Sequence, residues 1–437
     1  MPVSKPVPPR TVLQFKETVF AAAPHPSKAV VATGLASGHV FAHRYAKDDI
    51  EDENYREDSD EDDDDVSAGS VSKSANAATA TLLWKTRRHK GSCRALAFDD
   101  DGRYLYTVGS DSVIKQASPE DGRVIAKNSV DIKAPPTALA ATPTHALVGT
   151  ESGSLHIFDP RTLKVTATYD NLHDGDYITS ITHLAQYQST MQFITTGSTT
   201  VSRVDIRKGV VSTSENQEDE LLCSCVAYPS YFEYNPVKPG QRNNGPPPKR
   251  VPVTAVVGTS TGVLTFWTRD NWEDQQQRAI ISDDSIDCIA EYPGEKIIVS
   301  GGDSVVRLMD VKQRKSLGVE FVHGGEDGVV AVCCDSWERV ISAGGETVKI
   351  WDVPQQLNQS SKKSGTGNTS DSDSDESDKD YEKDDSDSDN EDGDDDDSGD
   401  DGEKTKRKRK RKRKSKMKHK IAAAKKAPPR PSFAGLD

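Results

Sequence analysis

The 437-residue sequence contains no apolar run long enough to cross a membrane, and its proline-rich start, residues 1–10, has no apolar signal core. A membrane-spanning helix needs about 20 mostly apolar residues, and a secretory signal needs an apolar stretch close behind the N-terminus. Because both are missing, we expect a soluble intracellular protein that makes no membrane contact.

Sequence patterns of enzymes and metalloproteins are scarce as well. The chain has no phosphate-binding loop, no H-E-x-x-H motif and no C-x-x-C pair, which are common markers of nucleotide and metal sites. One G-x-S-x-G match occurs at residues 258–262. A strand-like run, Val263–Trp267, follows it, where a nucleophile elbow requires a helix. We therefore interpret the match as a hairpin and expect no catalytic residue, no cofactor and no metal.

The cysteines are expected to be core residues. Each falls in or beside the first strand of a repeat, where small buried side chains are favoured. The six are Cys93, Cys223, Cys225, Cys288, Cys333 and Cys334.

What the sequence does contain is a repeat, in which a short apolar run ends in a glycine turn and a second apolar run follows. The repeating glycines are Gly34, Gly109, Gly149, Gly197, Gly258, Gly301 and Gly344. A period of about 40–45 residues built from short strands and Gly, Ser and Asp turns is typical of a β-propeller with four-stranded blades. The sequence therefore predicts an all-β protein with a single seven-bladed propeller over residues 11–353.

Blade 2 shows the expected pattern best, with strands named a to d from the centre outwards. Its strands are predicted at Cys93–Phe98, Tyr104–Val108, Val113–Ala117 and Val124–Lys127, separated by glycine- and aspartate-rich turns.

Blade 7 has only three strands of its own, because the chain becomes polar after Pro354. The strand-like segment Thr11–Lys16 precedes blade 1 and is predicted to supply the missing outer strand. This pairing would close the ring and remove an open sheet edge. We expect Phe15 to pack inward against blade 7.

The ends of the predicted c strands read Ile157-Phe158-Asp159, Leu308-Met309-Asp310 and Ile350-Trp351-Asp352, with Phe266-Trp267 in blade 5. In these motifs the chain resembles the WD-repeat family over nearly all of residues 11–353. The resemblance implies a ring that binds partners and has no catalytic activity of its own.

The resemblance also implies a buried tetrad in each blade, made of a His, a Ser or Thr, an Asp and a Trp. Blade 2 offers His89, Thr107 and Asp111, but Ala117 stands at the Trp position. In blade 7, Gly345 replaces the Asp. Since no blade is complete, we expect the ring to depend more on apolar packing than on buried polar networks.

Charge is segregated outside the ring. Residues 48–65 carry a net charge of −12, residues 371–403 carry −18 and residues 404–437 carry +15, which leaves +1 for the rest. Acidic runs repel themselves and cannot build a core. The expected organisation is a flexible N-terminus at 1–10, a disordered acidic insertion in blade 1 at 46–80, a Pro-rich loop in blade 5 at 229–250, and disordered acidic and basic tails at 354–403 and 404–437. All four appendages should leave from one face of the ring, so the other face stays open for a partner.

The acidic runs have several possible roles. They could act as a solubilising tail, as a nucleic-acid mimic that binds basic proteins, or as an intramolecular cover for the basic run. Serines that precede acids suit an acid-directed kinase, and each phosphate would add about −1.5 to −2 charge. The candidate phosphosites are Ser59, Ser372, Ser374, Ser377, Ser386 and Ser388.

The basic run has the composition of a nuclear and nucleolar import signal. It contains no interleaved aromatics for base stacking, so its RNA contact would be with phosphates, through counterion release and without sequence preference. Its cations are Lys404, Lys406, Arg407, Lys408, Arg409, Lys410, Arg411, Lys412, Arg413, Lys414, Lys416, Lys418 and Lys420.

The chain resembles the WD-repeat-containing protein 55 family in three ring segments, Val31–Val40, Arg88–Ala95 and Phe321–Val330. The acidic insertion and the basic tail also fit that family. This resemblance implies a nucleolar scaffold in pre-ribosomal RNA processing and large-subunit maturation, a monomer within a larger complex of assembly factors, with no assigned catalytic residues. The alternative is a chromatin-associated or ubiquitin-ligase adaptor that binds histones or other basic proteins. Cellular location and co-purifying proteins distinguish the two, because propeller geometry does not.

Overall fold

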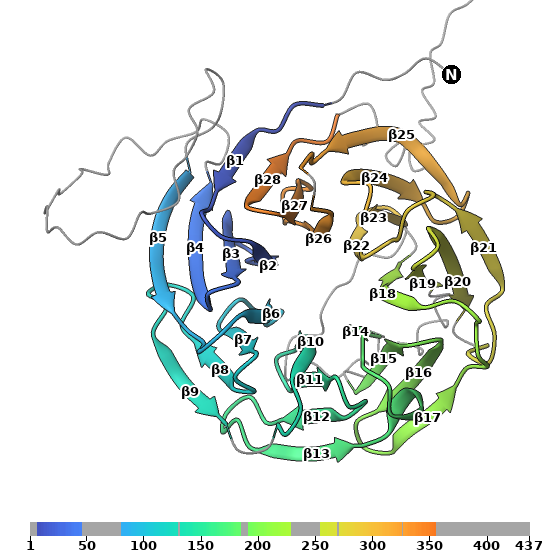
Figure 1. Cartoon of the computed structure of the whole chain (residues 1–437), viewed down its shortest axis with the longest axis horizontal. Helices are drawn as coiled ribbons and strands as arrows, with labels where there is room; N and C mark the ends of the chain where they lie inside the picture. Colours follow the sequence, from blue (N-terminus) through green and yellow to red (C-terminus); the bar gives the residue numbers. More distant parts are fainter. Residues whose placement is uncertain are drawn as a thin grey trace, which may run out of the picture. The chain divides into compact units, whose positions relative to one another are not determined.

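The computed structural model describes residues 7–45, 80–129, 132–184, 191–228, 254–268, 271–325 and 327–354, all of which belong to the unit Met1–Gly367. The predicted disorder of residues 46–79 and 355–437 and the Pro-rich loop at 229–250 lie outside the described residues. The described strands form seven four-stranded antiparallel sheets arranged as a ring (Figure 1). The predicted seven-bladed propeller is therefore confirmed.

Each blade contributes one strand to each of four concentric positions (Figure 1). The innermost strands a are β2 (Val19–Pro24), β6 (Cys93–Phe98), β10 (Pro136–Ala141), β14 (Ser180–His183), β18 (Leu221–Ala227), β22 (Cys288–Tyr292) and β26 (Val329–Cys334). Strands b are β3 (Val30–Leu35), β7 (Leu105–Gly109), β11 (Ala146–Thr150), β15 (Gln192–Gly197), β19 (Thr254–Thr259), β23 (Lys296–Ser300) and β27 (Val340–Gly344). Strands c are β4 (His39–Tyr45), β8 (Ile114–Ala117), β12 (Leu155–Phe158), β16 (Thr200–Asp205), β20 (Val263–Thr268), β24 (Val305–Asp310) and β28 (Thr347–Trp351). The outermost strands d are β5 (Ala80–Arg87), β9 (Val124–Asn128), β13 (Val165–Tyr169), β17 (Gly209–Thr213), β21 (Gln277–Ile280), β25 (Lys315–Val322) and β1 (Thr11–Gln14).

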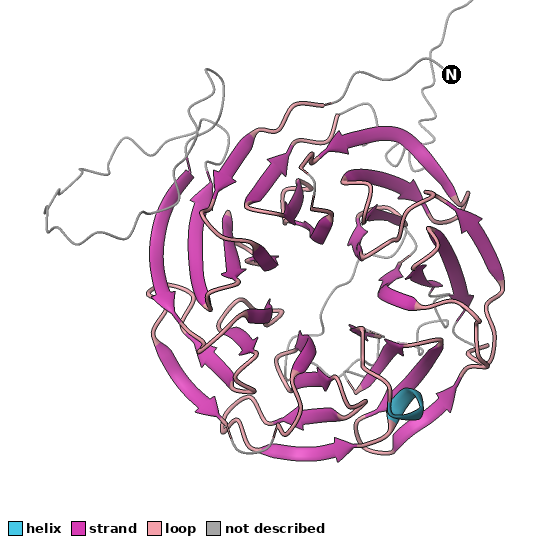
Figure 2. Ribbon diagram, viewed as in Figure 1, coloured by secondary structure: helices cyan, strands magenta, loops and turns pink. Residues whose placement is uncertain are grey.

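In the described part of the chain, the single helical element is a 3₁₀ turn, η1 (Leu172–Gly175), which Figure 2 shows beside blade 4. The expected strands of blade 2 agree with the structure to within one residue at each end. In blade 1, β5 begins at Ala80, which had been placed in the insertion.

The repeating glycines near the end of strand b are not required by the backbone conformation of a turn. None of the seven has a positive φ. A Cβ added at Gly109 would lie 2.4 Å from the His89 ring, and one added at Gly258 would lie 2.6 Å from Ile286. The connection between successive blades therefore passes too close to the end of strand b for any side chain, and the period in the sequence records this close approach.

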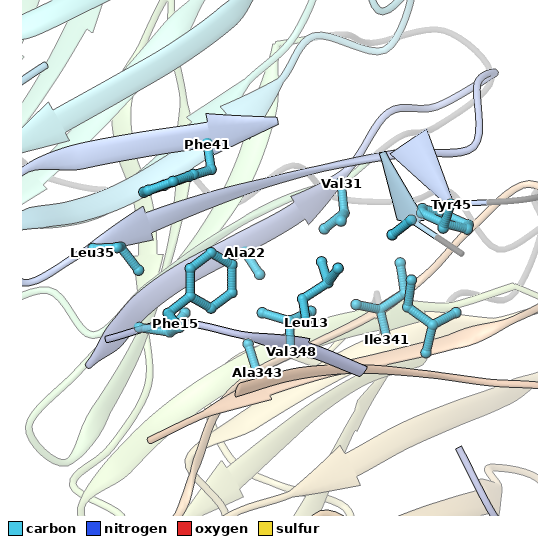
Figure 3. Close-up of a cluster of buried hydrophobic side chains, with 13 residues drawn as sticks. Leu13, Phe15, Ala22, Val31, Leu35, Phe41, Tyr45, Ile341, Ala343 and Val348 are labelled. Carbon is cyan, nitrogen blue, oxygen red and sulfur yellow. The ribbon is translucent and has the colours of Figure 1, made fainter. Parts of the chain in front are cut away.

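The closure of the ring follows the prediction. β1 pairs antiparallel with β28, from Thr11 opposite Ile350 to Gln14 opposite Thr347. Leu13 and Phe15 are 2% and 3% exposed and belong to the apolar cluster between blades 7 and 1 (Figure 3). Phe15 packs inward in a cluster that includes Ala343 and Val348 of blade 7, as expected, and its ring also meets that of Phe41 in blade 1 edge-on at 5.5 Å. Phe15 thus bridges the two blades that the closing strand joins.

Part of the N-terminal segment that we expected to be flexible belongs to the ring. Val7 packs on the core between blades 6 and 7. The Arg10 backbone NH donates to Ile350 O, and its guanidinium pairs with Asp352 at 3.1 Å. These contacts extend the closure by a few residues before β1.

The core of the protein lies between blades, as seven separate apolar clusters, one for each interface between neighbouring blades. All six cysteines lie on inner strands, as predicted, and burial raises the pKa of the Cys93 and Cys333 thiols to about 12.

The expected weakness of buried polar networks is not general. Between blades 4 and 5, the Ser180 hydroxyl lies 2.6 Å from that of Thr196 and 2.7 Å from that of Ser224. Thr182 extends this chain, 2.8 Å from Ser224. Sequence reasoning missed it because hydroxyls on neighbouring strands a are far apart along the chain.

Candidate partner-binding face

Two kinds of loop share one face of the ring, which we call the d–a face. It carries the connections from strand d of each blade to strand a of the next, together with the b–c hairpins, because strand direction alternates within each sheet. The opposite face carries the strand ends on either side of both insertions, namely β4 and β5 in blade 1 and β18 and β19 in blade 5. It also carries the start of the first strand, β1, and the end of the last strand, β28. The described strand ends that flank both predicted insertions and both termini therefore lie away from the d–a face, as expected.

In blade 2 a buried histidine ties the d–a connection to the sheet. His89 Nε2 lies 3.0 Å from Thr107 Oγ1 on strand b, and Nδ1 lies 2.9 Å from Asp111 in the hairpin. Asp111 also accepts from the Lys90 backbone NH at 3.0 Å. Ala117, which stands where the tetrad of the WD-repeat family has a Trp, is fully buried.

Blade 4 contains a second such histidine, which the sequence reasoning missed. His173 Nε2 lies 3.0 Å from Thr195 on strand b, and Nδ1 lies 2.7 Å from Thr200 Oγ1, at the first residue of β16. In blade 7, His323 pairs with Ser342 at 2.7 Å and with Thr347, the first residue of β28, at 3.0 Å. A strand-c threonine thus takes over the aspartate's hydrogen bond in both blades. The sequence signal for this variant of the network is a Ser or Thr on strand b followed five residues later by a Thr at the start of strand c.

A cavity lies over the histidine in both blades that use threonine. The one in blade 4 has a volume of about 420 Å³, and its walls include Asp174, Asp176 and Asn216. The one in blade 7 has a volume of about 410 Å³, and its lining includes Asp327, Glu346 and Lys349. A threonine is shorter than an aspartate and sits within the strand, so the space above the imidazole stays open, with carboxylates in both walls and a lysine in that of blade 7.

Burial lowers the pKa of His89, His173 and His323 to about 4. The three imidazoles are therefore neutral at pH 7, and each holds hydroxyl groups in place. This arrangement positions loops and does not favour acid–base chemistry near neutral pH.

The depressed pKa of His173 predicts a pH dependence of stability. Its stabilisation is complete above the unfolded pKa of about 6.5 and is lost as the pH falls toward 4, because the unfolded chain then binds the extra proton. His173→Gln should cost about 1–3 kcal/mol at pH 7, and the gap to the parent should shrink between pH 6.5 and 4. Denaturant unfolding at several pH values measures it. A gap independent of pH would contradict the assignment.

The G-x-S-x-G match is the hairpin between β19 and β20, as interpreted. Ser260 Oγ donates to Asp219 at 3.1 Å, so this hydroxyl ties the hairpin to the d–a connection beside it.

The predicted import signal, Lys404–Lys420, and all candidate phosphosites lie outside the described residues. Within the described part of the chain, His, Cys, Asp and Glu side chains form no group of three or more that could hold a metal ion. No helix in that part is long and apolar enough to cross a membrane.

Comparison with known proteins follows this geometry. The family model for the WD domain, G-beta repeat, matches residues 80–116. The WD repeat-containing protein JIP5 of Phaeosphaeria nodorum is 35% identical over 380 residues, which cover 78% of this chain and 83% of that protein. The WD repeat-containing protein jip5 of Aspergillus terreus is 34% identical over 364 residues, which cover 78% of this chain and 80% of that protein. The WD40 beta propeller domain of Doa1 shares the fold, with a TM-score of 0.57 at 12% identity over 80% of this chain and 97% of that domain.

Proposed function

The chain belongs to the family of WD-repeat proteins that includes the fungal JIP5 proteins, and from this premise we propose that it is a non-catalytic scaffold in nucleolar ribosome biogenesis. Its proposed role is in pre-ribosomal RNA processing and large-subunit maturation. The ring would bind protein partners among the assembly factors through its d–a face.

The observation that carries the proposal is the arrangement of charge along the chain. The residues outside the three charged runs sum to +1, whereas residues 371–403 carry −18 and residues 404–437 carry +15. A dense Lys and Arg run without aromatics suits import and loose, salt-sensitive contact with RNA phosphates. The described ring offers loops and cavities in which a partner could bind.

The test is depletion of the protein in cells together with imaging of a fluorescent fusion. The fusion should concentrate in the nucleolus. Depletion should cause precursor ribosomal RNA to accumulate and should lower the ratio of large to small subunits. A normal subunit ratio and normal precursor levels after full depletion would refute the role.

The carboxylates in the walls of the blade 4 and blade 7 cavities favour a second candidate, an adaptor that binds histones or other basic proteins on chromatin. The same fusion separates the two, because an adaptor of this kind would follow chromatin and co-purify with histones. A scaffold would co-purify with pre-ribosomal particles.

A further inference from the structure

The charge of the d–a face is strongly uneven around the ring. Four consecutive d–a connections, residues 170–179, 214–220, 281–287 and 323–328, contain eleven described Asp and Glu, and their described residues include no Lys or Arg. We call them the acidic arc. The connection that enters blade 2 carries Arg88 and Lys90, and those that enter blades 1 and 3 each contain one Lys and one acid and sum to zero. The net charge of +1 for all residues outside the charged runs conceals this division.

The carboxylates of the acidic arc are not neutralised by cations of the described ring, although Asp170 and Asp219 accept hydrogen bonds from hydroxyls of neighbouring hairpins. Among the described residues, none of them forms an ion pair with this chain's own cations, although carboxylates elsewhere on the ring do, such as Asp205 with Arg207 at 3.0 Å. Asp174, Glu218 and Asp284 are exposed. The cavities of blades 4 and 7, each with two carboxylates in its wall, lie at the two ends of the acidic arc.

A second, independent feature of the same face is apolar. Five inner strands open with a β-bulge at the same position, and the extra residue is Phe20 in blade 1 and Val330 in blade 7. These two are 39% and 42% exposed. β2 and β26 are neighbours at the centre of the ring (Figure 1), so both side chains lie where strands a begin, at the d–a face. Bulges often present a side chain for function.

Together these features define the chemistry of the occupant. Carboxylates are acceptors only, so the acidic arc needs a ligand rich in donors and positive charge. A metal ion does not meet that need, because no three acidic, His or Cys side chains of the described chain converge on one point. The two exposed apolar side chains next to the arc call for an apolar group on the same ligand.

We propose that the d–a face, from the cavity of blade 4 across the acidic arc to Phe20 and Val330, is the docking site for a Lys- and Arg-rich segment of a partner protein that carries an apolar anchor. The proposal rests on the proposed function in taking this face as the partner-binding face, and it names the partner's chemistry. Lys or Arg side chains occupy the carboxylate-lined cavity of blade 4 and pair with the exposed acids of the arc, and the anchor covers the apolar pair.

The test uses the full-length protein and a fluorescein-labelled peptide of alternating lysine and alanine with one central leucine, followed by anisotropy at physiological salt. The triple variant Asp174→Asn, Glu218→Gln, Asp284→Asn should bind the peptide about tenfold more weakly, since each exposed pair contributes modestly. Val330→Thr should weaken binding about fivefold by removing apolar burial without changing side-chain size.

The matched control variants make the same changes in charge and hydropathy at positions outside the d–a face. Asp101→Asn, Glu120→Gln and Asp274→Asn neutralise three exposed acids outside the d–a face, and Val211→Thr changes an outer strand. Both should bind like the parent. The acidic run 371–403 contributes the same background to every variant. Equal weakening by the controls would overturn the proposal, because binding would then follow bulk charge.

Carbodiimide coupling of carboxylates to lysines, read by mass spectrometry, locates the contact directly. Adducts of the peptide should map to the acidic arc. Cross-links from the arc to the chain's own residues 404–426 that exclude the peptide would overturn the choice of a partner protein. Failure of either binding test leaves the depletion phenotype unchanged, so the two proposals fail separately.

Discussion

Deleting residues 1–18 is expected to destabilise the whole ring, well beyond blade 7. The deletion removes β1 and with it the Leu13 and Phe15 side chains from the cluster that joins blades 7 and 1. It also leaves β28 as an open sheet edge, which favours aggregation. Calorimetry should show one transition at a much lower temperature. An unchanged melting temperature would mean that β1 does not hold the ring closed.

Point variants separate packing from the loss of a strand. Leu13→Ala and Phe15→Ala should each cost about 2–5 kcal/mol, as expected for truncation of buried apolar side chains. Lys16→Ala is the matched control, because Lys16 is exposed just beyond the same strand, and it should stay within about 0.5 kcal/mol of the parent. A similar loss for all three variants would contradict the packing seen in Figure 3.

The second large effect concerns the charged C-terminal runs. Removing residues 404–426 should abolish RNA binding and disperse the protein from the nucleolus, because the residues outside the charged runs sum to only +1 and contain no other dense cationic run for phosphate contacts. Removing residues 371–403 should tighten RNA binding at low salt, since this −18 segment competes for the same cations.

Filter binding or anisotropy across a salt series measures both effects. Affinity should fall steeply with salt for the full chain and for the variant without the acidic run. Phosphorylation between Ser372 and Ser388 should act like added acid and weaken binding further. Sequence-selective RNA binding by the ring that resists salt would contradict this division between ring and tail.

The architecture was predictable because each blade repeats the same physical problem. The spacing of glycines such as Gly109 and Gly258 reports where the next connection crosses the end of strand b. The closing strand was predictable because blade 7 lacked one strand and one apolar segment, Thr11–Lys16, had no partner. The exact partner of the Phe15 ring was not, since it depends on how two blades meet.

The candidate site was less accessible from the sequence. Asp174, Glu218 and Asp284 lie in separate connections, and only the alternation of strand direction brings them to one face. The near-zero sum of the residues outside the charged runs gave no sign of it, because cations elsewhere in those residues cancel the acids of the arc. The exposure of Val330 depends on a bulge in strand pairing, which period-two patterning does not reveal.

Cross-linking with mass spectrometry on purified pre-ribosomal particles tests the central claim most directly, that the d–a face is where this scaffold binds its partner. Loops of the d–a face, above all residues 170–179, 214–220 and 281–287, should cross-link to a Lys- and Arg-rich segment of a ribosomal or assembly protein. Cross-links confined to the opposite face, or absence of the protein from these particles, would contradict the account.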